Sequence, residues 1–312
     1  MIKATFDIAR SLLSPVLGGA ERLDLRERVV LITGAGAGIG RELARSLYDR
    51  GAYLALFDVD AAAVRAAAAE LGIRATAVAV DVADREGVRL AIEQVRESFG
   101  RIDVVVANAG VVPRPATVRL MDPEEFDRVL SINLTGAFNT IQPALDAVID
   151  AGGHVVVVSS CAAFAPGMGG SPYMVSKAGV EQLGRAIRVE LGGTGATAGV
   201  VYFGVVETAM TRGTLDEDEL GARIGDLLPW PLNQRISARE AAGVITGAIE
   251  HRSARAVAPI GWQPYALLRG AVNVVLDHKL VADENVRSLT RRLERRVLAD
   301  RADAVESVRS GR

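Results

Sequence analysis

The sequence predicts an α/β protein, with a doubly wound parallel sheet of about seven strands and helices on both faces. From Arg28 onward, short apolar runs alternate with longer amphipathic runs, and this β-α alternation is typical of doubly wound folds. The apolar runs are almost continuous, as expected when helices cover both faces of a parallel sheet. A glycine-rich segment, Thr33–Gly40, separates the first apolar run from the first amphipathic one.

The expected elements follow one another without an internal linker. Strands are predicted at 29–34, 52–60, 75–82, 102–110, 153–160 and 196–204, with a weaker seventh near 254–259. Helices are predicted at 41–51, 61–72, 84–100 and 123–150, and over the stretch that carries Tyr173. Asp122 and Pro123 begin the long helix as its N-cap and first helical residue. One domain is therefore expected over residues 28–260.

A helical extension is expected at each end of this domain. Residues 1–27 carry apolar side chains at helical spacing, which predicts a helix that packs on the domain, on a second subunit or on a membrane surface. Residues 261–312 begin with apolar positions at helical spacing, Leu267, Ala271, Val274 and His278. Five arginines then crowd one helix: Arg287, Arg291, Arg292, Arg295 and Arg296. The arginines indicate a solvated helix face, a subunit contact or peripheral contact with an anionic membrane.

The composition narrows the function classes. Hydrophobic residues make up 49% of the 312 residues and the net charge is −2, so the chain can bury a sizeable core and lacks the basic field of a nucleic-acid-binding protein. Cys161 is the single cysteine, so no disulfide is expected. No metal is expected either, because His154, His251 and His278 lack metal-ligand spacing. The absence of a signal peptide and of a membrane-spanning run favours the cytoplasm.

The glycine-rich segment reads TGAGAGIG and lies between a strand and a helix. Gly34 would allow the sharp turn, Gly38 would let the backbone approach a ligand, and Gly40 would let the helix pack closely on the strand. The start of the helix would then present its N–H groups to a pyrophosphate. Asp58, which ends the second strand, would accept hydrogen bonds from the ribose of NAD and repel the 2′-phosphate of NADP. The sequence thus predicts NAD as the preferred cofactor, with Arg41 as the nearest cation to the turn.

A second cluster lies between Ser160 and Lys177. Tyr173 and Lys177 are four residues apart, so on a helix they lie on one face. A neighbouring ammonium favours the phenolate and lowers the pKa of a tyrosine, which allows proton exchange with an alcohol near neutral pH. Cys161 has no histidine beside it and is expected to pack under the site.

Together these motifs resemble the classical short-chain dehydrogenase/reductase family over about residues 28–260. The residues that carry the resemblance are TGAGAGIG at 33–40, Asp81-Val82, Asn108-Ala109-Gly110, Asn133, Ser160, Tyr173 and Lys177. The resemblance implies a Rossmann fold and hydride transfer between a nicotinamide and a secondary alcohol or ketone. It also favours a homodimer or homotetramer. One departure is Phe203-Gly204, where members usually have Pro-Gly, and a large aromatic there would narrow the pocket.

The resemblance assigns roles to individual residues. Tyr173 would be the general acid/base, Lys177 would lower its pKa, Ser160 would position the substrate oxygen, and Asn133 would hold a water that connects Lys177 to solvent. The residues implied to bind the cofactor are Gly34, Gly38, Ile39, Gly40, Asp58, Asp81, Val82, Asn108, Gly110, Tyr173, Lys177 and Thr208.

The substrate is expected to lie under a lid formed by residues 205–235. This segment combines an acidic patch, Asp216–Glu219, with Leu227, Leu228, Trp230 and Leu232. The apolar residues indicate either a lipophilic substrate or a lid that closes against the core. The expected function is NAD-dependent oxidation of a secondary alcohol or the reverse reaction. The alternatives are an NADPH-dependent carbonyl or 3-oxoacyl-thioester reductase, and a non-catalytic dinucleotide-binding protein.

Overall fold

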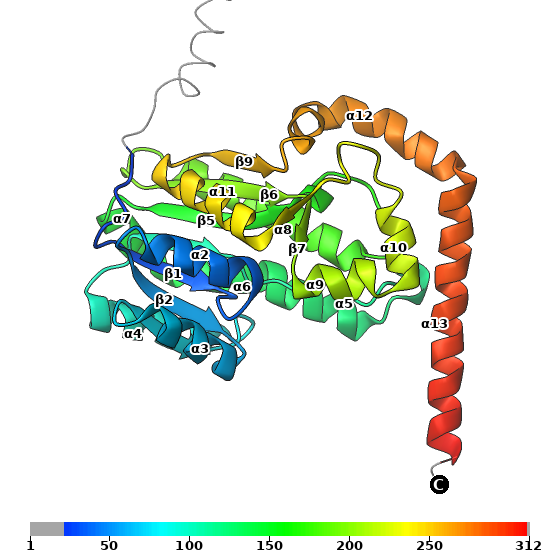
Figure 1. The fold of residues 1–312 in the computed structure, drawn as a ribbon, viewed down its shortest axis with the longest axis horizontal. Helices are drawn as coiled ribbons and strands as arrows, with labels where there is room; N and C mark the ends of the chain where they lie inside the picture. The colour runs from blue at the N-terminus through cyan, green and yellow to red at the C-terminus, as the bar shows by residue number, and fades with distance from the viewer. Residues whose placement is uncertain (1–21, 311–312) are drawn as a thin grey trace, which may run out of the picture.

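A single parallel sheet forms the centre of the protein, of which the computed structural model describes residues 22–310. Its strands are β1 (Val29–Thr33), β2 (Tyr53–Asp58), β3 (Ala75–Ala79), β4 (Val104–Ala107), β5 (His154–Ser160), β6 (Thr197–Phe203) and β9 (Arg255–Ala258). Their order is β3-β2-β1-β4-β5-β6-β9, and every neighbouring pair is parallel (Figure 1). The strand order reverses between β1 and β4, so a crevice is expected at their carboxyl ends. The predicted fold is confirmed, whereas the helix expected over the first residues lies outside the described range.

Helices cover both faces of the sheet. One face packs against α2 (Gly38–Tyr48), α3 (Ala61–Leu71) and α11 (Ala238–Glu250). The other packs against α4 (Arg85–Phe99), α6 (Gly136–Ile141), α7 (Leu145–Asp150) and α8 (Ser171–Glu190). Side chains alternate between faces along a strand, and Ile32 belongs to the first core cluster while Leu31 belongs to the second. Both faces of β1 are buried, which explains its uninterrupted apolar sequence.

The segment predicted as one helix over 123–150 is interrupted. It consists of α5 (Pro123–Leu130), a π-helical turn η2 (Ser131–Thr135), α6, a 3₁₀ turn η3 (Gln142–Ala144) and α7. Pro143 lies in the 3₁₀ turn and has no N–H to continue an α-helix, which accounts for that interruption. The π-helical turn contains Asn133, and such turns often occur at functional sites.

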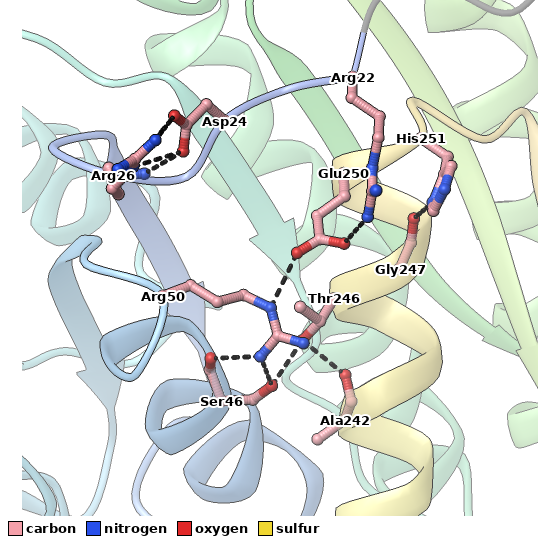
Figure 2. A network of polar contacts seen from close by, with 10 residues as sticks. All are labelled: Arg22, Asp24, Arg26, Ser46, Arg50, Ala242, Thr246, Gly247, Glu250 and His251. Carbon is pink, nitrogen blue, oxygen red and sulfur yellow. Dashed lines mark hydrogen bonds and ion pairs between the residues drawn. The ribbon is translucent and has the colours of Figure 1, made fainter.

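A polar network joins the start of the described chain to α2 and α11 (Figure 2). The Glu250 carboxylate accepts hydrogen bonds from Arg22 and Arg50, at 2.9 and 2.8 Å. The Leu23 N–H donates to the Glu250 carbonyl, at 2.8 Å. Burial alone would raise the pKa of Glu250, but the hydrogen bonds from the two arginines outweigh it and hold the pKa below its ordinary value.

Two segments extend beyond the central sheet. The lid contains β7 (Val205–Glu207), α9 (Ala209–Thr211), a π-helical turn η5 (Arg212–Asp216), α10 (Glu219–Gly225) and β8 (Arg235–Ser237). β7 and β8 pair in parallel as a separate two-stranded sheet, which the sequence pattern did not predict. The C-terminal segment forms α12 (Trp262–Ala282) and α13 (Glu284–Ser310). Figure 1 shows α13 as a long helix beside α10.

Candidate active site

The glycine-rich turn connects β1 to α2 and is shaped by glycines that no other residue could replace. Gly34 has φ +66°, and a Cβ at this position would lie 2.9 Å from the Ala109 Cα. A Cβ at Gly40 would lie 2.1 Å from the Gly34 carbonyl oxygen, so α2 can approach the strand only without a side chain there. Gly38 has φ +52°, and a Cβ there would face Thr208 at 3.5 Å. The predicted reasons for Gly34 and Gly40 match these contacts.

Asp58 lies at the end of β2 and is held against the glycine-rich turn. Its carboxylate accepts a hydrogen bond from the Gly36 N–H at 2.8 Å and one from the Asp60 N–H at 3.0 Å. A Cβ at Gly36, the fourth glycine of the turn, would lie 3.0 Å from the Asp58 carboxylate and would crowd it. The sequence analysis assigned no role to Gly36, although its position within TGAGAGIG could have indicated one.

Asn108 connects the two strands at which the strand order reverses. Its side chain donates to the Thr33 carbonyl at 2.9 Å, and its backbone N–H donates to the Thr33 hydroxyl at 3.1 Å. The residue therefore holds β4 to the glycine-rich turn. Thr208 lies near Gly38 of the turn, and its side chain caps α9 through hydrogen bonds with Thr211.

A cavity of about 460 Å³ extends along the carboxyl ends of the strands. The predicted site residues in its wall are Gly34, Gly38, Ile39, Asp58, Asp81, Val82, Asn108, Gly110, Ser160, Tyr173, Lys177 and Thr208. Gly40 and Asn133 lie behind the wall. The lining also includes apolar residues that the sequence reading did not single out, among them Val111, Ile132, Val206 and Met210. They follow strands or belong to the lid, and no local motif marks them.

The three predicted chemical groups meet at one end of this cavity. Tyr173 and Lys177 lie on the first turns of α8, with the Lys177 Nζ 5.6 Å from the centre of the Tyr173 ring. The Lys177 ammonium donates to the Val158 carbonyl at 2.9 Å. Ser160 ends β5, and its hydroxyl donates to the Phe203 carbonyl at 3.1 Å while it accepts from the Ala162 N–H at 3.2 Å.

The electrostatics of this end differ from the expected pattern. Burial raises the pKa of the Tyr173 phenol, and a hydrogen bond with Ser160 offsets this only in part. Burial also lowers the pKa of Lys177 to about 8. The net shift of the phenol pKa is therefore upward, because removal from water disfavours the charged form, and the lowering of this pKa by Lys177 stays a prediction.

Asn133 is 1% exposed and supports the site from behind. Its side-chain carbonyl accepts from the Val111 N–H at 2.7 Å. Its amide donates to the Val111 carbonyl at 2.9 Å and to the Ser176 hydroxyl at 3.0 Å. These contacts join the segment after β4 to α8, and the predicted role of Asn133 in holding a water stays a prediction.

The unusual Phe203 ends β6, its buried side chain belongs to the first core cluster, and the residue is among those that line the cavity. A Cβ on the following Gly204 would lie 2.4 Å from the Trp262 indole nitrogen, so the glycine makes room for that ring. Trp262 belongs to a buried aromatic cluster with Phe164, Tyr202 and Tyr265. Cys161 lies in this cluster and is 1% exposed. Burial raises the pKa of its thiol far above the ordinary value, which makes it a poor nucleophile.

The cavity has the features that a dinucleotide requires. The first N–H groups of α2 have no partner within the helix and lie at a glycine-rich turn, and the Asp58 carboxylate lies at the same turn. A side chain at Gly38 would fill the gap toward Thr208. Ser160, Tyr173 and Lys177 lie at the other end. The residues present therefore fit an NAD-type cofactor.

Comparison with known proteins agrees with this geometry. The family described as short chain dehydrogenase matches residues 28–219. The chain belongs to this family. A solved member, a short-chain type dehydrogenase/reductase from Mycobacterium marinum, superposes with a TM-score of 0.67 at 29% identity, over 75% of this chain and 94% of that chain. The short-chain dehydrogenase match ends within the lid, so it leaves α12 and α13 uncovered.

Two curated relatives illustrate the range of similar proteins. A probable oxidoreductase, EphD, from Mycobacterium tuberculosis is 33% identical over 254 residues, which is 77% of this chain. This chain spans only 42% of the length of that relative. The 3-oxoacyl-[acyl-carrier-protein] reductase FabG from Haemophilus influenzae is 28% identical over 73% of this chain and 97% of its own length.

Proposed function

We propose that this short-chain dehydrogenase is an NAD-dependent oxidoreductase that interconverts a secondary alcohol and a ketone. The observation that carries the proposal is one continuous cavity, with the Asp58 carboxylate at the glycine-rich turn and Ser160, Tyr173 and Lys177 in the same wall. A non-catalytic dinucleotide-binding protein would not need this set of proton-transferring side chains. Membership of the short-chain dehydrogenase family supports the same reading.

Each side chain has a defined task in this mechanism. When bound, NAD would supply the group that exchanges a hydride with the carbinol carbon and, when oxidised, a positive charge near Tyr173. Tyr173 acts as the phenolate, after its own proton has left to solvent, and its oxygen takes the proton of the substrate alcohol; the nearby Lys177 ammonium stabilises the phenolate. The Ser160 hydroxyl donates to the substrate oxygen and stabilises its developing charge. To do so, it must release the Phe203 carbonyl to which it now donates.

The proton path beyond Lys177 remains a prediction of this proposal. Asn133 was expected to hold a water, but its side chain already makes hydrogen bonds with Val111 and Ser176. We therefore propose that the Asn133 side chain positions the backbone around Lys177. Both side chains face Gly110: the Lys177 Nζ lies 3.4 Å and the Asn133 Oδ1 3.3 Å from a Cβ built on that glycine.

The role of Tyr173 can be tested with two variants on α8. Tyr173→Phe should reduce turnover to below about 1% of wild type, because it removes the oxygen that is proposed to take the substrate proton, while NADH binding stays within about twofold. Ser171→Ala is the matched control, since the Ser171 hydroxyl is buried without a hydrogen-bond partner among the described residues. Turnover would be followed as NADH absorbance with a panel of secondary alcohols. Activity above a few per cent in Tyr173→Phe would overturn the assignment.

The preference for NAD over NADP rests on Asp58. A carboxylate at this position repels a 2′-phosphate, and Arg41, the cation beside the turn, donates to Glu70 at 2.7 Å. Fluorescence titration should show NADH binding about tenfold or more tightly than NADPH. Tighter binding of NADPH would reverse the cofactor assignment and favour the carbonyl or 3-oxoacyl-thioester reductase reading, which the similarity to FabG supports.

We propose a lipophilic substrate on the basis of Val111, Val206 and Met210 in the cavity wall. The lid leucines carry less of this argument than the sequence indicated. Leu228 and Leu232 pack on the aromatic cluster around Trp262, and Leu227 packs on α13, so they close the lid against the protein.

Assembly and location complete the proposal. We propose a cytoplasmic homodimer or homotetramer, which light scattering would test. No helix among residues 22–310 is both long and apolar enough to cross a membrane. We do not extend the proposal to a membrane surface, because Arg292 and Arg296 form ion pairs within the chain.

A further inference from the structure

The C-terminal helix α13 contacts three separate connections at the carboxyl edge of the sheet. These are the segment after β4, which contains the 3₁₀ turn η1 (Val118–Leu120), the segment after β5 and the lid after β6. In a parallel sheet, the connections that leave the carboxyl ends of the strands surround the substrate. α13 therefore lies where a single helix can hold these three connections in place relative to Tyr173.

The contacts with the lid are both apolar and ionic. Leu289 and Leu293 of α13 form a buried cluster with Leu220 of α10, and Met168 and Leu227 pack against it. Arg296 pairs with Asp218 at 2.5 Å, and Arg292 pairs with Glu219 at 2.9 Å. Two residues of the acidic patch therefore pair with two arginines of the tail, although the sequence gave no sign that these segments meet.

Asp218 links this ion pair to the fold of the lid. One of its carboxylate oxygens accepts from the Gly221 N–H at 2.6 Å at the start of α10, and the other accepts from Arg296. A Cβ on Gly221 would lie 1.8 Å from the Thr214 carbonyl oxygen, so α10 packs directly on the η5 backbone. The η5 turn continues from α9, whose Met210 and Thr211 line the cavity. A contiguous path therefore runs from α13 to the cavity wall.

The opposite side of α13 is anchored on the segment after β4. Glu294 accepts from the Arg119 guanidinium at 2.7 Å and from the Thr117 hydroxyl at 3.0 Å. Arg301 donates to the Leu120 carbonyl at 2.9 Å. The helix is thus held on both sides of the cavity opening.

We propose that α13 holds the substrate lid in place, with Arg296 as the positioning residue that acts through Asp218. The consequence for substrate binding rests on the proposed alcohol dehydrogenase function, whereas the holding of the lid does not. Loss of the Arg296 contact should let residues 209–225 open more often, which weakens substrate binding and leaves the cofactor site unchanged.

The test uses the full-length protein with Arg296→Glu, which places a second negative charge against Asp218. Amide hydrogen exchange of residues 209–225 should increase about tenfold, and the KM for a secondary alcohol should rise by a similar factor. Both kcat and the Kd for NADH should stay within about twofold. Adding Asp218→Asn, which retains an oxygen for the Gly221 N–H, should restore most of the exchange protection by removing the repulsion.

Arg295→Glu is the matched control, because Arg295 is exposed on the same helix and makes no ion pair among the described residues. It should change neither exchange nor KM. If Arg296→Glu fails to fold, Arg296→Gln should give a smaller increase in exchange of about threefold. Unchanged exchange at 209–225, or no recovery with Asp218→Asn, would overturn the holding role. Faster exchange in a protein that oxidises no secondary alcohol would instead refute the proposed function alone.

Discussion

The environment of Lys177 departs far from that of a free side chain. It is 5% exposed, and burial lowers the pKa of its ammonium to about 8. Its spacing from Tyr173 was readable from the sequence, because four residues make one helical turn. Its burial could not be predicted, because the Val158 carbonyl comes from β5 and the nearby Gly110 from the segment after β4, both distant in sequence.

This burial predicts a pH dependence of stability. Between pH 8 and the ordinary lysine value of 10.5, the unfolded state binds the proton that the folded state has lost, so the free energy of unfolding rises with pH. From pH 8 to 10.5, the free energy of unfolding of the wild type should therefore rise by on the order of 3 kcal/mol relative to that of Lys177→Met. Denaturant unfolding of both proteins at several pH values would measure the difference. A difference that stays constant or falls with pH would contradict it.

At the scale of single elements, the glycine-rich turn is the part that sequence reasoning described best. Gly34 and Gly38 have positive φ, and Gly40 packs on the Gly34 carbonyl within the same strand-turn-helix unit, and such local constraints leave a local pattern. The π-helical turn at Asn133 shows the opposite case. It depends on hydrogen bonds to Val111 and Ser176, which lie 22 and 43 residues away, so periodicity alone predicted an unbroken helix.

Two glycine variants compare a glycine with close contacts in the turn and a glycine with open space around it. Gly40→Ala should destabilise the protein by about 3 kcal/mol or more and abolish NADH binding, because its Cβ would lie 2.1 Å from the Gly34 carbonyl oxygen. Gly243→Ala, in the exposed middle of α11 with open space around it, should stabilise the protein by up to about 1 kcal/mol. Thermal unfolding and NADH titration would measure both. Equal effects of the two substitutions would show that the turn tolerates a side chain.

At the scale of the whole molecule, the sheet was predictable and the assembly of the outer segments was not. Continuous apolar runs identify strands that are buried on both faces, so the fold follows from local composition. The pairing of Arg296 with Asp218 joins residues 78 apart in the chain, and each group by itself resembles an ordinary solvated charge. The position of the tail over the lid could therefore be learned only from the structure.

The network around Glu250 holds the first described residues to α11, and it should weaken in acid. A carboxylate with a lowered pKa stabilises the fold above its unfolded value of about 4.5, and this contribution is lost as the pH falls through the lower folded value. Glu250→Gln should cost about 1 kcal/mol at pH 7 and progressively less below pH 4.5. Glu97→Gln, an exposed residue of α4, is the control and should show neither effect. A cost for Glu250→Gln that persists unchanged at pH 3 would disprove the linkage.

The aromatic ring that occupies the space beside Gly204 has a practical consequence. The chain has two tryptophans. Trp262 is buried and donates to the Leu232 carbonyl at 3.0 Å, whereas Trp230, two residues before Leu232, is 78% exposed. Intrinsic fluorescence should therefore divide into a blue-shifted emission that iodide does not quench and a red-shifted emission that it does. Because Trp230 lies in the lid and Trp262 contacts the lid at Leu232, the unlabelled protein carries its own optical probe of lid opening.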